Sequence, residues 1–393
     1  MTATTARVLA CRPASIVFDA QDRAHISDEE TRNAVEDGAR LIRDGHCVAF
    51  PTETVYGLGA NALEPSAVRK IFETKGRPSD NPLIVHVSSR DMLSSLLPPN
   101  YRISDHYETL IQAFWPGPLT LLFPAAPDIV PSVVTAGHPT VGVRMPAHPV
   151  ARGLISLANL PIAAPSANSS GKPSPTRAGH VANDLGSRVP LVLDGGACDV
   201  GVESTVLDGL QSDGVLRILR PGGVSVECIQ EALGPGGPRV LVHRRDFVDK
   251  TIEHAPTTPG MKYTHYSPSV PVVLLQTDNN VAHLQQESEP ETMHVILSSL
   301  LPLASTRSTV GIMSLSDSNL RSSLPTVVNW VQFDIGPRAE PSIMARRLFD
   351  GLLTLEAKGV ELIFVETISE DHEGLAIMNR LSKAASETRR VAM

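Results

Sequence analysis

The chain has 393 residues, 42% of them hydrophobic and 19% charged, which is long enough for two or three domains with buried cores. No apolar run approaches the ~18 residues of a membrane span, and the formal net charge of −8 argues against a protein whose main partner is a nucleic-acid backbone. Four scattered cysteines without a Cys-x-x-Cys pair indicate neither a disulfide framework nor a zinc site, and they favour a cytoplasmic setting.

Residues 1–27 are interpreted as a leader strand and a connection, since they lack a secretory apolar core and carry several acidic residues. Ser27 and Glu30 then form a capping-box pattern. Val35, Ala39 and Ile42 recur on one face, which predicts a helix that packs on a sheet.

The stretch 45–87 predicts a ligand site. Its apolar run 47–50 predicts a strand, and the polar, glycine-containing residues 51–59 predict a loop at the end of that strand. A helix should begin near Pro65, and a second strand should cover 83–87. The loops at the ends of these strands bring together hydroxyls, two cations and a histidine, which suits a small anionic ligand: Thr52, Thr54, Lys75, Arg77 and His86.

Residues 57–62 also match the loose dinucleotide pattern G-x-G-x-x-A, with Asp80 about twenty residues further on. The match is weak because a polar hexapeptide separates the strand from the glycines, and because the next helix does not open on them. A nicotinamide site is therefore disfavoured.

Further strands are predicted at 119–123, 141–144, 161–165, 191–194, 201–206 and 215–220. Arg144 ends one of them, where a guanidinium suits a carboxylate or phosphate and an ordinary salt bridge is equally compatible. Residues 165–176 form a loop rich in hydroxyls and amides, and Arg220 ends the last strand. Several strands thus finish in small, hydroxylic or cationic residues.

Residues 239–269 are rich in proline and polar residues and are interpreted as an ordered linker or lid. Beyond them, strands are expected at 270–275, 294–297, 310–313 and 361–365, and helices at 342–355 and 374–386. This alternation predicts a small parallel, Rossmann-like sheet over 270–393 without a phosphate-binding glycine loop.

Residues 28–238 closely resemble the YrdC-type threonylcarbamoyl-adenylate synthase domain. Seven stretches in the family's order carry the resemblance: 51–59, 75–86, 115–120, 140–146, 163–168, 201–205 and 219–222. The linker segment 258–268 resembles that of the longer, two-domain form of this enzyme. The resemblance implies a twisted mixed sheet with flanking helices and an open concave site, followed by the smaller C-terminal Rossmann-like domain.

The family joins L-threonine, bicarbonate and ATP into threonylcarbamoyl-adenylate and releases pyrophosphate, for N6-threonylcarbamoyladenosine in tRNAs that read ANN codons. Matching the family's ligand contacts onto this chain implies an ATP set of Arg77, Asn81, Thr140, Ser166, Ser174, Arg220 and Tyr266, with Lys75 adding charge at the phosphates. It implies a threonine set of Thr54, Thr52, His86, Arg144, Ala164 and Ser204. Lys75 and Arg77 are the catalytic candidates. Mg²⁺ is expected to arrive with ATP, without a protein cage, and the product is expected to pass to a tRNA threonylcarbamoyl transferase.

Three alternatives remain. An RNA-binding module would use the cations Lys75, Arg77, Arg144 and Arg220, but only 4% of the residues are aromatic, which leaves few candidates for base stacking. A serine hydrolase would use Ser166 or Ser204, but neither lies in G-x-S-x-G. The related chemistry of hydrogenase maturation would require zinc-finger and acylphosphatase segments, which this sequence lacks.

Overall fold

The computed structural model describes residues 6–249, 265–277, 289–301 and 307–392. The chain divides into two compact units. Met1–Ser170 with Ser174–Lys262 form the first, and Gly171–Pro173 with Tyr263–Met393 form the second. Among the described helices, none has the length and apolar character needed to cross a membrane.

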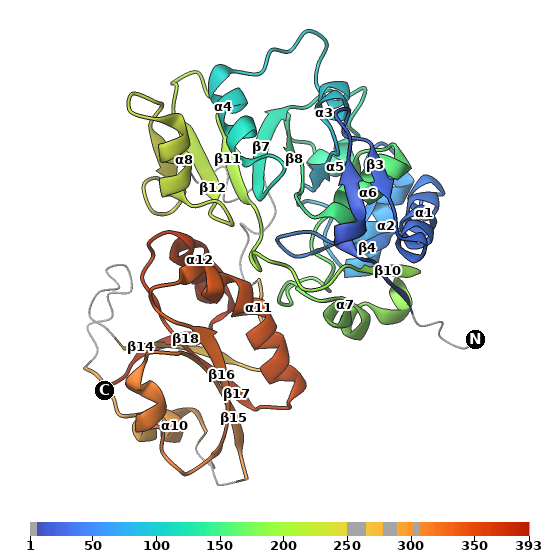
Figure 1. Ribbon diagram of the computed structural model, residues 1–393. Helices are drawn as coiled ribbons and strands as arrows, with labels where there is room; N and C mark the ends of the chain where they lie inside the picture. The colour runs from blue at the N-terminus through green and yellow to red at the C-terminus, as the bar shows by residue number, and fades with distance from the viewer. Residues whose placement is uncertain (1–5, 250–264, 278–288, 302–306, 393) are drawn as a thin grey trace. The chain divides into compact units, whose positions relative to one another are not determined.

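The first unit is built on a mixed sheet (Figure 1). Its strands are β1 (Arg7–Ala10), β4 (Val48–Pro51), β5 (Tyr56–Asn61), β6 (Ile84–His86), β7 (Leu119–Pro124), β8 (Thr140–Arg144), β9 (Ile162–Ala163), β10 (Leu191–Asp194), β11 (Thr205–Asp208), β12 (Leu216–Arg220) and β13 (Val240–Val242). Their order is β1-β10-β4-β5-β9-β6-β8-β7-β11-β12-β13, with parallel and antiparallel pairs. This confirms the expected twisted mixed sheet.

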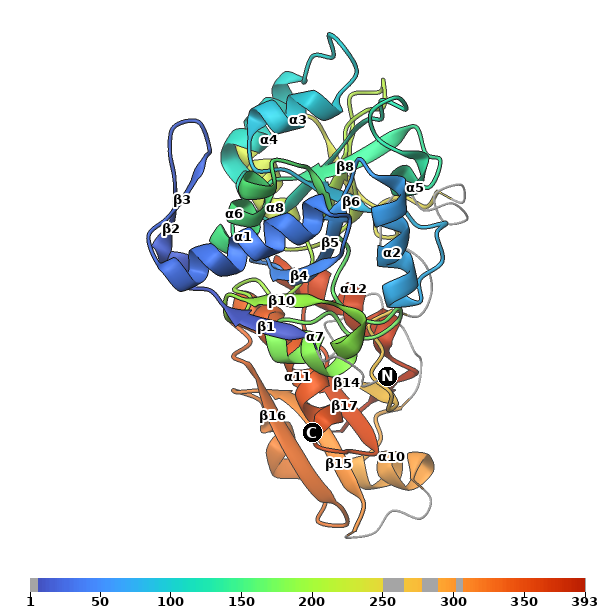
Figure 2. The same cartoon turned by 90° about the vertical axis from the view of Figure 1, so that its right-hand side faces the viewer.

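Helices flank this sheet, and a hairpin of β2 (Ile16–Phe18) and β3 (Ala24–Ile26) projects beside them (Figure 2). The helices are α1 (Glu29–Arg43), α2 (Pro65–Lys75), α3 (Arg90–Leu96), α4 (Asp105–Phe114), α5 (Ser132–Thr135), α6 (Pro149–Ala158), α7 (Ala178–Asp184) and α8 (Val226–Leu233), with 3₁₀ turns η1 (Pro13–Ser15) and η2 (Gly186–Arg188). Val35, Ala39 and Ile42 of α1 are fully buried, in one cluster with Leu154 of α6 and Leu193 of β10. The predicted apolar face of α1 is confirmed.

The second unit is a parallel sheet with helices (Figure 1). Its elements are β14 (Val272–Gln276), α10 (Met293–Leu300), β15 (Thr309–Leu315), η3 (Asn319–Ser323), β16 (Asn329–Gly336), α11 (Pro341–Ala357), β17 (Leu362–Glu366), α12 (Glu373–Ala384) and β18 (Glu387–Arg390). The strand order is β16-β15-β17-β14-β18, and every pair is parallel. The Rossmann-like prediction is confirmed.

The predicted loop at 51–59 is too long, because Pro51 belongs to β4 and residues 56–59 belong to β5. The chain turns at 52–55 and returns antiparallel to β4, pairing Pro51 with Tyr56 and Val48 with Gly59. A Cβ atom on Gly59 would lie 2.5 Å from Ile162 Cγ2 and 2.6 Å from Phe50 Cε1. This glycine therefore permits close packing within the sheet rather than marking a loop.

One predicted helix cap and one predicted strand also need correction. Asp28, not Ser27, caps α1, since its carboxylate accepts the Thr31 N–H at 2.9 Å. The segment 294–297 lies in α10 rather than in a strand, because Thr292 caps a helix whose Met293, Ile296 and Leu297 are buried at helical spacing.

Strands of the large sheet lie in the predicted leader and in the predicted linker. The expected leader strand is β1, which pairs in parallel with β10. The start of the expected linker forms β13, which pairs in parallel with β12. Residues 250–264 of the expected linker lie outside the described residues.

All four cysteines are free thiols. Cys11, Cys47 and Cys198 are buried, and burial raises the pKa of the Cys11 and Cys47 thiols to about 12. Cys228, on α8, is exposed.

Candidate functional site

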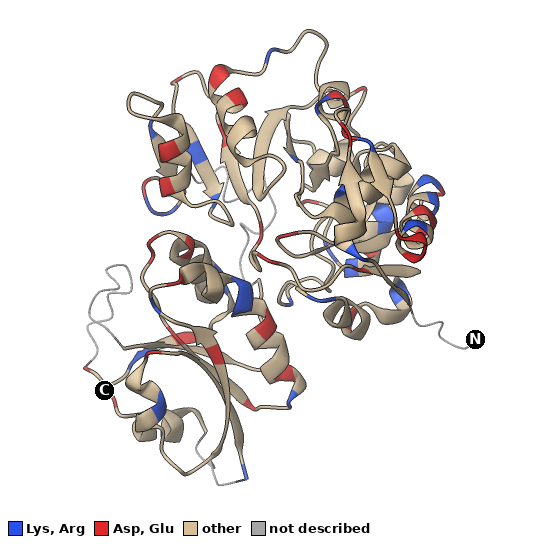
Figure 3. Cartoon of the chain, in the orientation of Figure 1, with Lys and Arg blue, Asp and Glu red and all other residues tan. Residues whose placement is uncertain are grey.

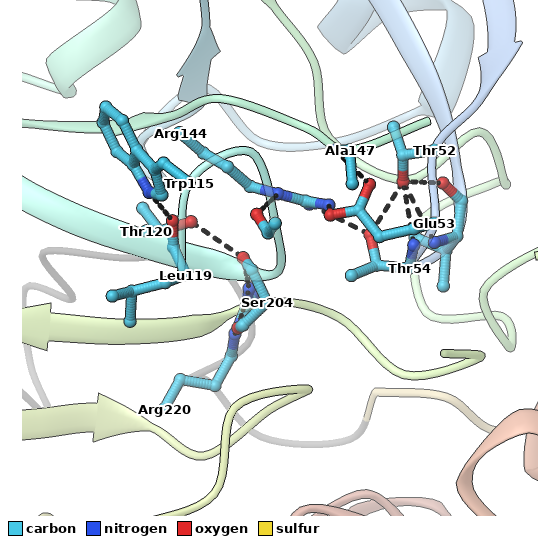
Figure 4. Close-up of polar contacts among 12 residues, drawn as sticks. Thr52, Glu53, Thr54, Trp115, Leu119, Thr120, Arg144, Ala147, Ser204 and Arg220 are labelled. Carbon is cyan, nitrogen blue, oxygen red and sulfur yellow. Dashed lines mark hydrogen bonds and ion pairs between the residues drawn. The ribbon is translucent and has the colours of Figure 1, made fainter. Parts of the chain in front are cut away.

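Arg144, the last residue of β8, lies at the centre of a buried polar cluster (Figure 4). Its Nε donates to the Gly117 carbonyl at 3.0 Å, Nη1 donates to Thr54 Oγ1 at 2.9 Å, and Nη2 donates to Glu53 Oε1. The other oxygen of Glu53 accepts the Ala147 N–H at 3.0 Å. Sequence alone left Arg144 as either a ligand contact or an ordinary salt bridge. It forms an internal ion pair, and it also contacts Thr54, which is predicted to bind the substrate L-threonine.

The turn between β4 and β5 presents the hydroxyls of this cluster. Thr52 Oγ1 and Thr54 Oγ1 lie 2.7 Å apart, and Thr52 also bonds to the Val55 carbonyl at 2.6 Å. The turn is anchored from outside, because the carbonyls of Glu53 and Thr54 accept N–H groups of residues 200 and 201. The side chains at 52–54 are therefore held in fixed positions.

His86 stands next to Arg144, since the two residues are register partners in the parallel pair of β6 and β8. The ring is 4% exposed, and its Nδ1 has no hydrogen-bond partner among the described residues. Burial, assisted by the positive charge of Arg144, lowers the pKa of His86 to about 3. The imidazole is therefore neutral at neutral pH, with one nitrogen available to a ligand.

A second cluster joins Ser204 to Arg220, at the end of β12 (Figure 4). Arg220 Nη2 donates to the Ser204 carbonyl at 2.8 Å and to its hydroxyl at 3.2 Å. The Ser204 hydroxyl also lies 2.8 Å from Thr120 Oγ1 on β7, and all three side chains are buried. Ser204, predicted to bind L-threonine, and Arg220, predicted to bind ATP, are thus in direct contact.

Lys75, at the end of α2, is 4% exposed, and its Nζ donates to the carbonyls of Ser166 at 2.5 Å and Asn168 at 2.6 Å. Burial, with the charge of Arg77 beside it, holds the Lys75 pKa well below its usual value. Through these two hydrogen bonds, Lys75 links the loop 165–176 to α2. Ala164 leads into that loop, and its N–H bonds to the Ile84 carbonyl of β6 at 3.0 Å.

The remaining predicted ATP residues of the first unit lie on loops and strand ends. Ser174 donates to Glu203 Oε1 at 2.6 Å, and Arg77 Nη2 donates to the Asn81 carbonyl at 3.3 Å. Asn81 Oδ1 and Thr140 Oγ1 are buried without a hydrogen-bond partner among the described residues. Such atoms are rare in folded proteins and suit a site that a ligand completes.

A hollow of about 490 Å³ borders this region at the end of α2. Its lining includes the predicted ATP residue Arg77 together with Arg69, Phe72, Glu73, Gly76, Pro78 and Ser79. The hollow therefore combines one aromatic ring with charged groups of both signs.

Tyr266, the predicted ATP contact from the linker, belongs to the second unit. It is 6% exposed, and its ring centroid lies 5.3 Å from that of Phe349 and 5.8 Å from the Arg380 guanidinium carbon. Its nucleotide contact stays a prediction. The other predicted site residues all lie in the first unit, where Arg144 bonds to Thr54, Arg220 to Ser204 and Lys75 to Ser166.

Sequence reasoning missed three buried residues of these clusters: Glu53, Thr120 and Glu203. Each contacts a predicted site residue: Glu53 contacts Arg144, Thr120 contacts Ser204, and Glu203 contacts Ser174. Glu53 and Glu203 directly precede Thr54 and Ser204 in the sequence, which was the available signal.

The chain is similar to known proteins over nearly its whole length. Residues 40–222 match a family model described as Telomere recombination (Sua5_yciO_yrdC), and residues 224–386 match one described as Threonylcarbamoyl-AMP synthase, C-terminal domain. The threonylcarbamoyl-AMP synthase of Schizosaccharomyces pombe is 44% identical over 93% of this chain and 91% of its own length. The Bacillus subtilis protein of the same name is 42% identical over 92% of this chain and 96% of its own length.

The chain belongs to the threonylcarbamoyl-AMP synthase family. Its fold agrees with solved structures of this family. Pyrococcus abyssi Sua5 complexed with L-threonine superposes with a TM-score of 0.76 at 38% identity, covering 98% of this chain and 100% of that one. A P. abyssi Sua5 variant, with a histidine and a tyrosine replaced by alanine, gives a TM-score of 0.78 at 37% identity, covering 98% of both chains.

Proposed function

We propose that the protein makes L-threonylcarbamoyladenylate from L-threonine, bicarbonate and ATP and releases pyrophosphate. The observation that carries this proposal is its family membership over nearly its whole length. The polar clusters of the first unit support it, because they bury hydroxyls, cations and a neutral imidazole close together.

For L-threonine, the proposal assigns the carboxylate to Arg144. An arginine has five N–H donors, and three of these are engaged with Gly117, Thr54 and Glu53, which leaves two for a ligand. The hydroxyls of Thr52, Thr54 and Ser204, the neutral ring of His86 and the small side chain of Ala164 complete the proposed set.

For ATP, the proposal assigns Arg77, Asn81, Thr140, Ser166, Ser174, Arg220 and Tyr266. The carbamate oxygen must meet the α-phosphorus in line with the departing pyrophosphate, so positioning and charge neutralisation supply the catalysis. Arg77 and Arg220 would neutralise phosphate charge directly. Lys75 would act in part by holding the Ser166 loop, since its Nζ bonds to two carbonyls there.

Magnesium enters as part of the substrate. In the part of the chain that the structure describes, no group of three His, Cys, Asp or Glu side chains is arranged to hold a metal ion. Because Mg²⁺ commonly binds through substrate phosphates and keeps several waters, we propose that the ATP phosphates carry it.

The product would supply a transferase that forms N6-threonylcarbamoyladenosine on tRNAs reading ANN codons. Direct tRNA contact and the cytoplasmic location both stay predictions. The RNA-binding alternative has less support, because Lys75, Arg144 and Arg220 are only 3–4% exposed and basic and acidic residues are interspersed over the helices (Figure 3).

The test incubates the full chain with Mg²⁺, ATP, bicarbonate and one amino acid at a time, and follows pyrophosphate release and the acyl-adenylate by mass spectrometry. We expect release that requires both threonine and bicarbonate. Lys75→Ala and Arg77→Ala should abolish it, whereas Lys70→Ala, on the same helix as Lys75, should not. Wild-type rates in either of the first two variants would contradict that assignment, and release independent of threonine would contradict the proposed function.

A further inference from the structure

Glu53 and Arg144 form a buried ion pair. Arg144 is predicted to bind the substrate L-threonine, but Glu53 has no role among the predicted contacts. Their side chains are 9% and 4% exposed, so both charges have lost most of their hydration. Burial of two charges is costly, and an arginine needs no fixed carboxylate in order to bind a substrate carboxylate. The partner carboxylate therefore calls for an explanation in terms of the ligand.

Both members of the pair keep hydrogen-bonding capacity. Arg144 has two N–H groups left after its three contacts. Glu53 accepts from Arg144 Nη2 and from the Ala147 N–H, which uses two of about four acceptor positions of a carboxylate. A ligand that reaches the pair therefore meets donors on one member and acceptors on the other.

Two further titratable groups near the pair carry no charge. His86, beside Arg144, is neutral because its pKa is about 3. Burial raises the pKa of Cys198, and the negative charge of Glu53 raises it further, so this thiol is neutral as well. A ligand bearing only a carboxylate would place an uncompensated negative charge beside Glu53, whereas a zwitterion adds no net charge.

We propose that Glu53 binds the ammonium group of the amino-acid substrate while Arg144 binds its carboxylate. The two charged groups of an α-amino acid sit on one carbon atom, and the two charged side chains are in direct contact at the ends of β4 and β8 (Figure 4). The pair would then select α-amino acids against simple carboxylic acids. This inference rests on the proposed function and adds to it a residue that recognises the amine.

The experiment compares two ligands that differ only in the amine, L-threonine and (R)-3-hydroxybutyrate, by calorimetric titration of the full chain. The wild-type protein should bind L-threonine at least about 30-fold more tightly. Glu53→Gln keeps the size and an acceptor for the Ala147 N–H but removes the charge. This variant should bind L-threonine more weakly and (R)-3-hydroxybutyrate about as well as the wild type does. Most of the difference in affinity between the two ligands should therefore disappear. Asp37→Asn, a charge-matched change on α1, should leave both affinities unchanged.

Several outcomes would overturn the inference. If Glu53→Gln weakens both ligands equally, Glu53 only positions Arg144, and a loss of threonine affinity below about threefold excludes both roles. ATP titration reports whether the variant is folded. If it is not, Glu53→Asp, which keeps the charge on a shorter side chain, must retain a preference for threonine that is smaller than the wild-type one. A wild-type protein that binds no threonine would instead contradict the proposed function itself.

Discussion

Each unit of the molecule contains a buried glutamate beside an arginine, and the two pairs differ in how fully they are satisfied. Glu53 and Arg144 of the first unit are both buried, and each has spare hydrogen-bonding capacity. Glu366 of the second unit is 0% exposed, yet its partner Arg338, 3.6 Å away, is 42% exposed. Glu366 also accepts the Leu315 N–H at 3.0 Å and the Thr277 hydroxyl at 3.2 Å.

A structural ion pair and the proposed ligand-binding pair are expected to differ in this way. In the second unit, backbone and hydroxyl donors from neighbouring strands satisfy the glutamate, and solvent hydrates the arginine. In the first unit, the pair lies beside His86, which has a buried atom without a described partner. Polar groups that stay incompletely paired after folding mark the places that a ligand is expected to complete.

The largest effect is expected from Arg144→Lys, which keeps the charge but loses the planar fork. Threonine-dependent pyrophosphate release should fall about 100-fold or more, because lysine cannot hold Gly117, Thr54, Glu53 and a substrate carboxylate together. Arg90→Lys is the control, since the Arg90 guanidinium donates hydrogen bonds to the partly exposed Glu108. Equal losses in the two variants would erase the contrast between functional and structural pairs.

His86 predicts a dependence of stability on pH that arises in the first unit. The folded imidazole stays neutral down to about pH 3, whereas the unfolded one binds a proton below about 6.5. Protonation therefore favours unfolding, and the free energy of unfolding should fall by a few kcal/mol as the pH drops through this window. Urea titrations should show a much smaller fall for His86→Gln, while His106→Gln, on the surface of α4, should behave like wild type.

Gly222→Ala tests how closely the backbone packs around Ser204. The new Cβ atom would meet the backbone of residues 203–205 at about 2.3 Å, so the strand ends must separate. We expect a loss of about 1–3 kcal/mol in the free energy of unfolding, together with weaker ATP binding. Gly179→Ala, in α7 where no atom lies within 4 Å of the new Cβ, should be neutral or slightly stabilising. If Gly222→Ala left the free energy of unfolding unchanged, the backbone around Ser204 would be able to shift at little cost.

The smallest effect is expected from Glu366→Gln. Burial raises the pKa of Glu366, so its ionisation opposes folding, and the amide can still accept the Leu315 N–H. The free energy of unfolding at neutral pH should change by less than about 1 kcal/mol, with threonine affinity unchanged. A loss above ~3 kcal/mol would show that this pair stabilises the second unit as a buried ion pair.

The sequence predicted the fold where periodicity was long and failed where apolar runs were short. The face of α1 and the parallel order of the second unit followed from spacing. The run 294–297 was ambiguous, because four apolar residues fit either a strand or the helix α10. Gly59 of β5 suggested a loop, because its role depends on close packing against Phe50 and Ile162, which only the folded sheet brings together.

For the candidate site, too, the sequence predicted some residues and missed others. Loops at strand ends predicted hydroxyls and cations, and some of these are in contact around Arg144 and Ser204, while their ligand contacts stay predictions. Local patterns could not assign Glu53, because its partner lies 91 residues further along the chain and the pairing depends on the sheet order. Thr120 escaped for the same reason, since it appears in sequence as one residue of an apolar strand.

The four cysteines have a practical consequence for every experiment above. Three thiols are buried and remain protonated near neutral pH, so thiol reagents should attach to the native protein at Cys228 alone. One fluorophore per molecule can then be placed on α8 without any substitution.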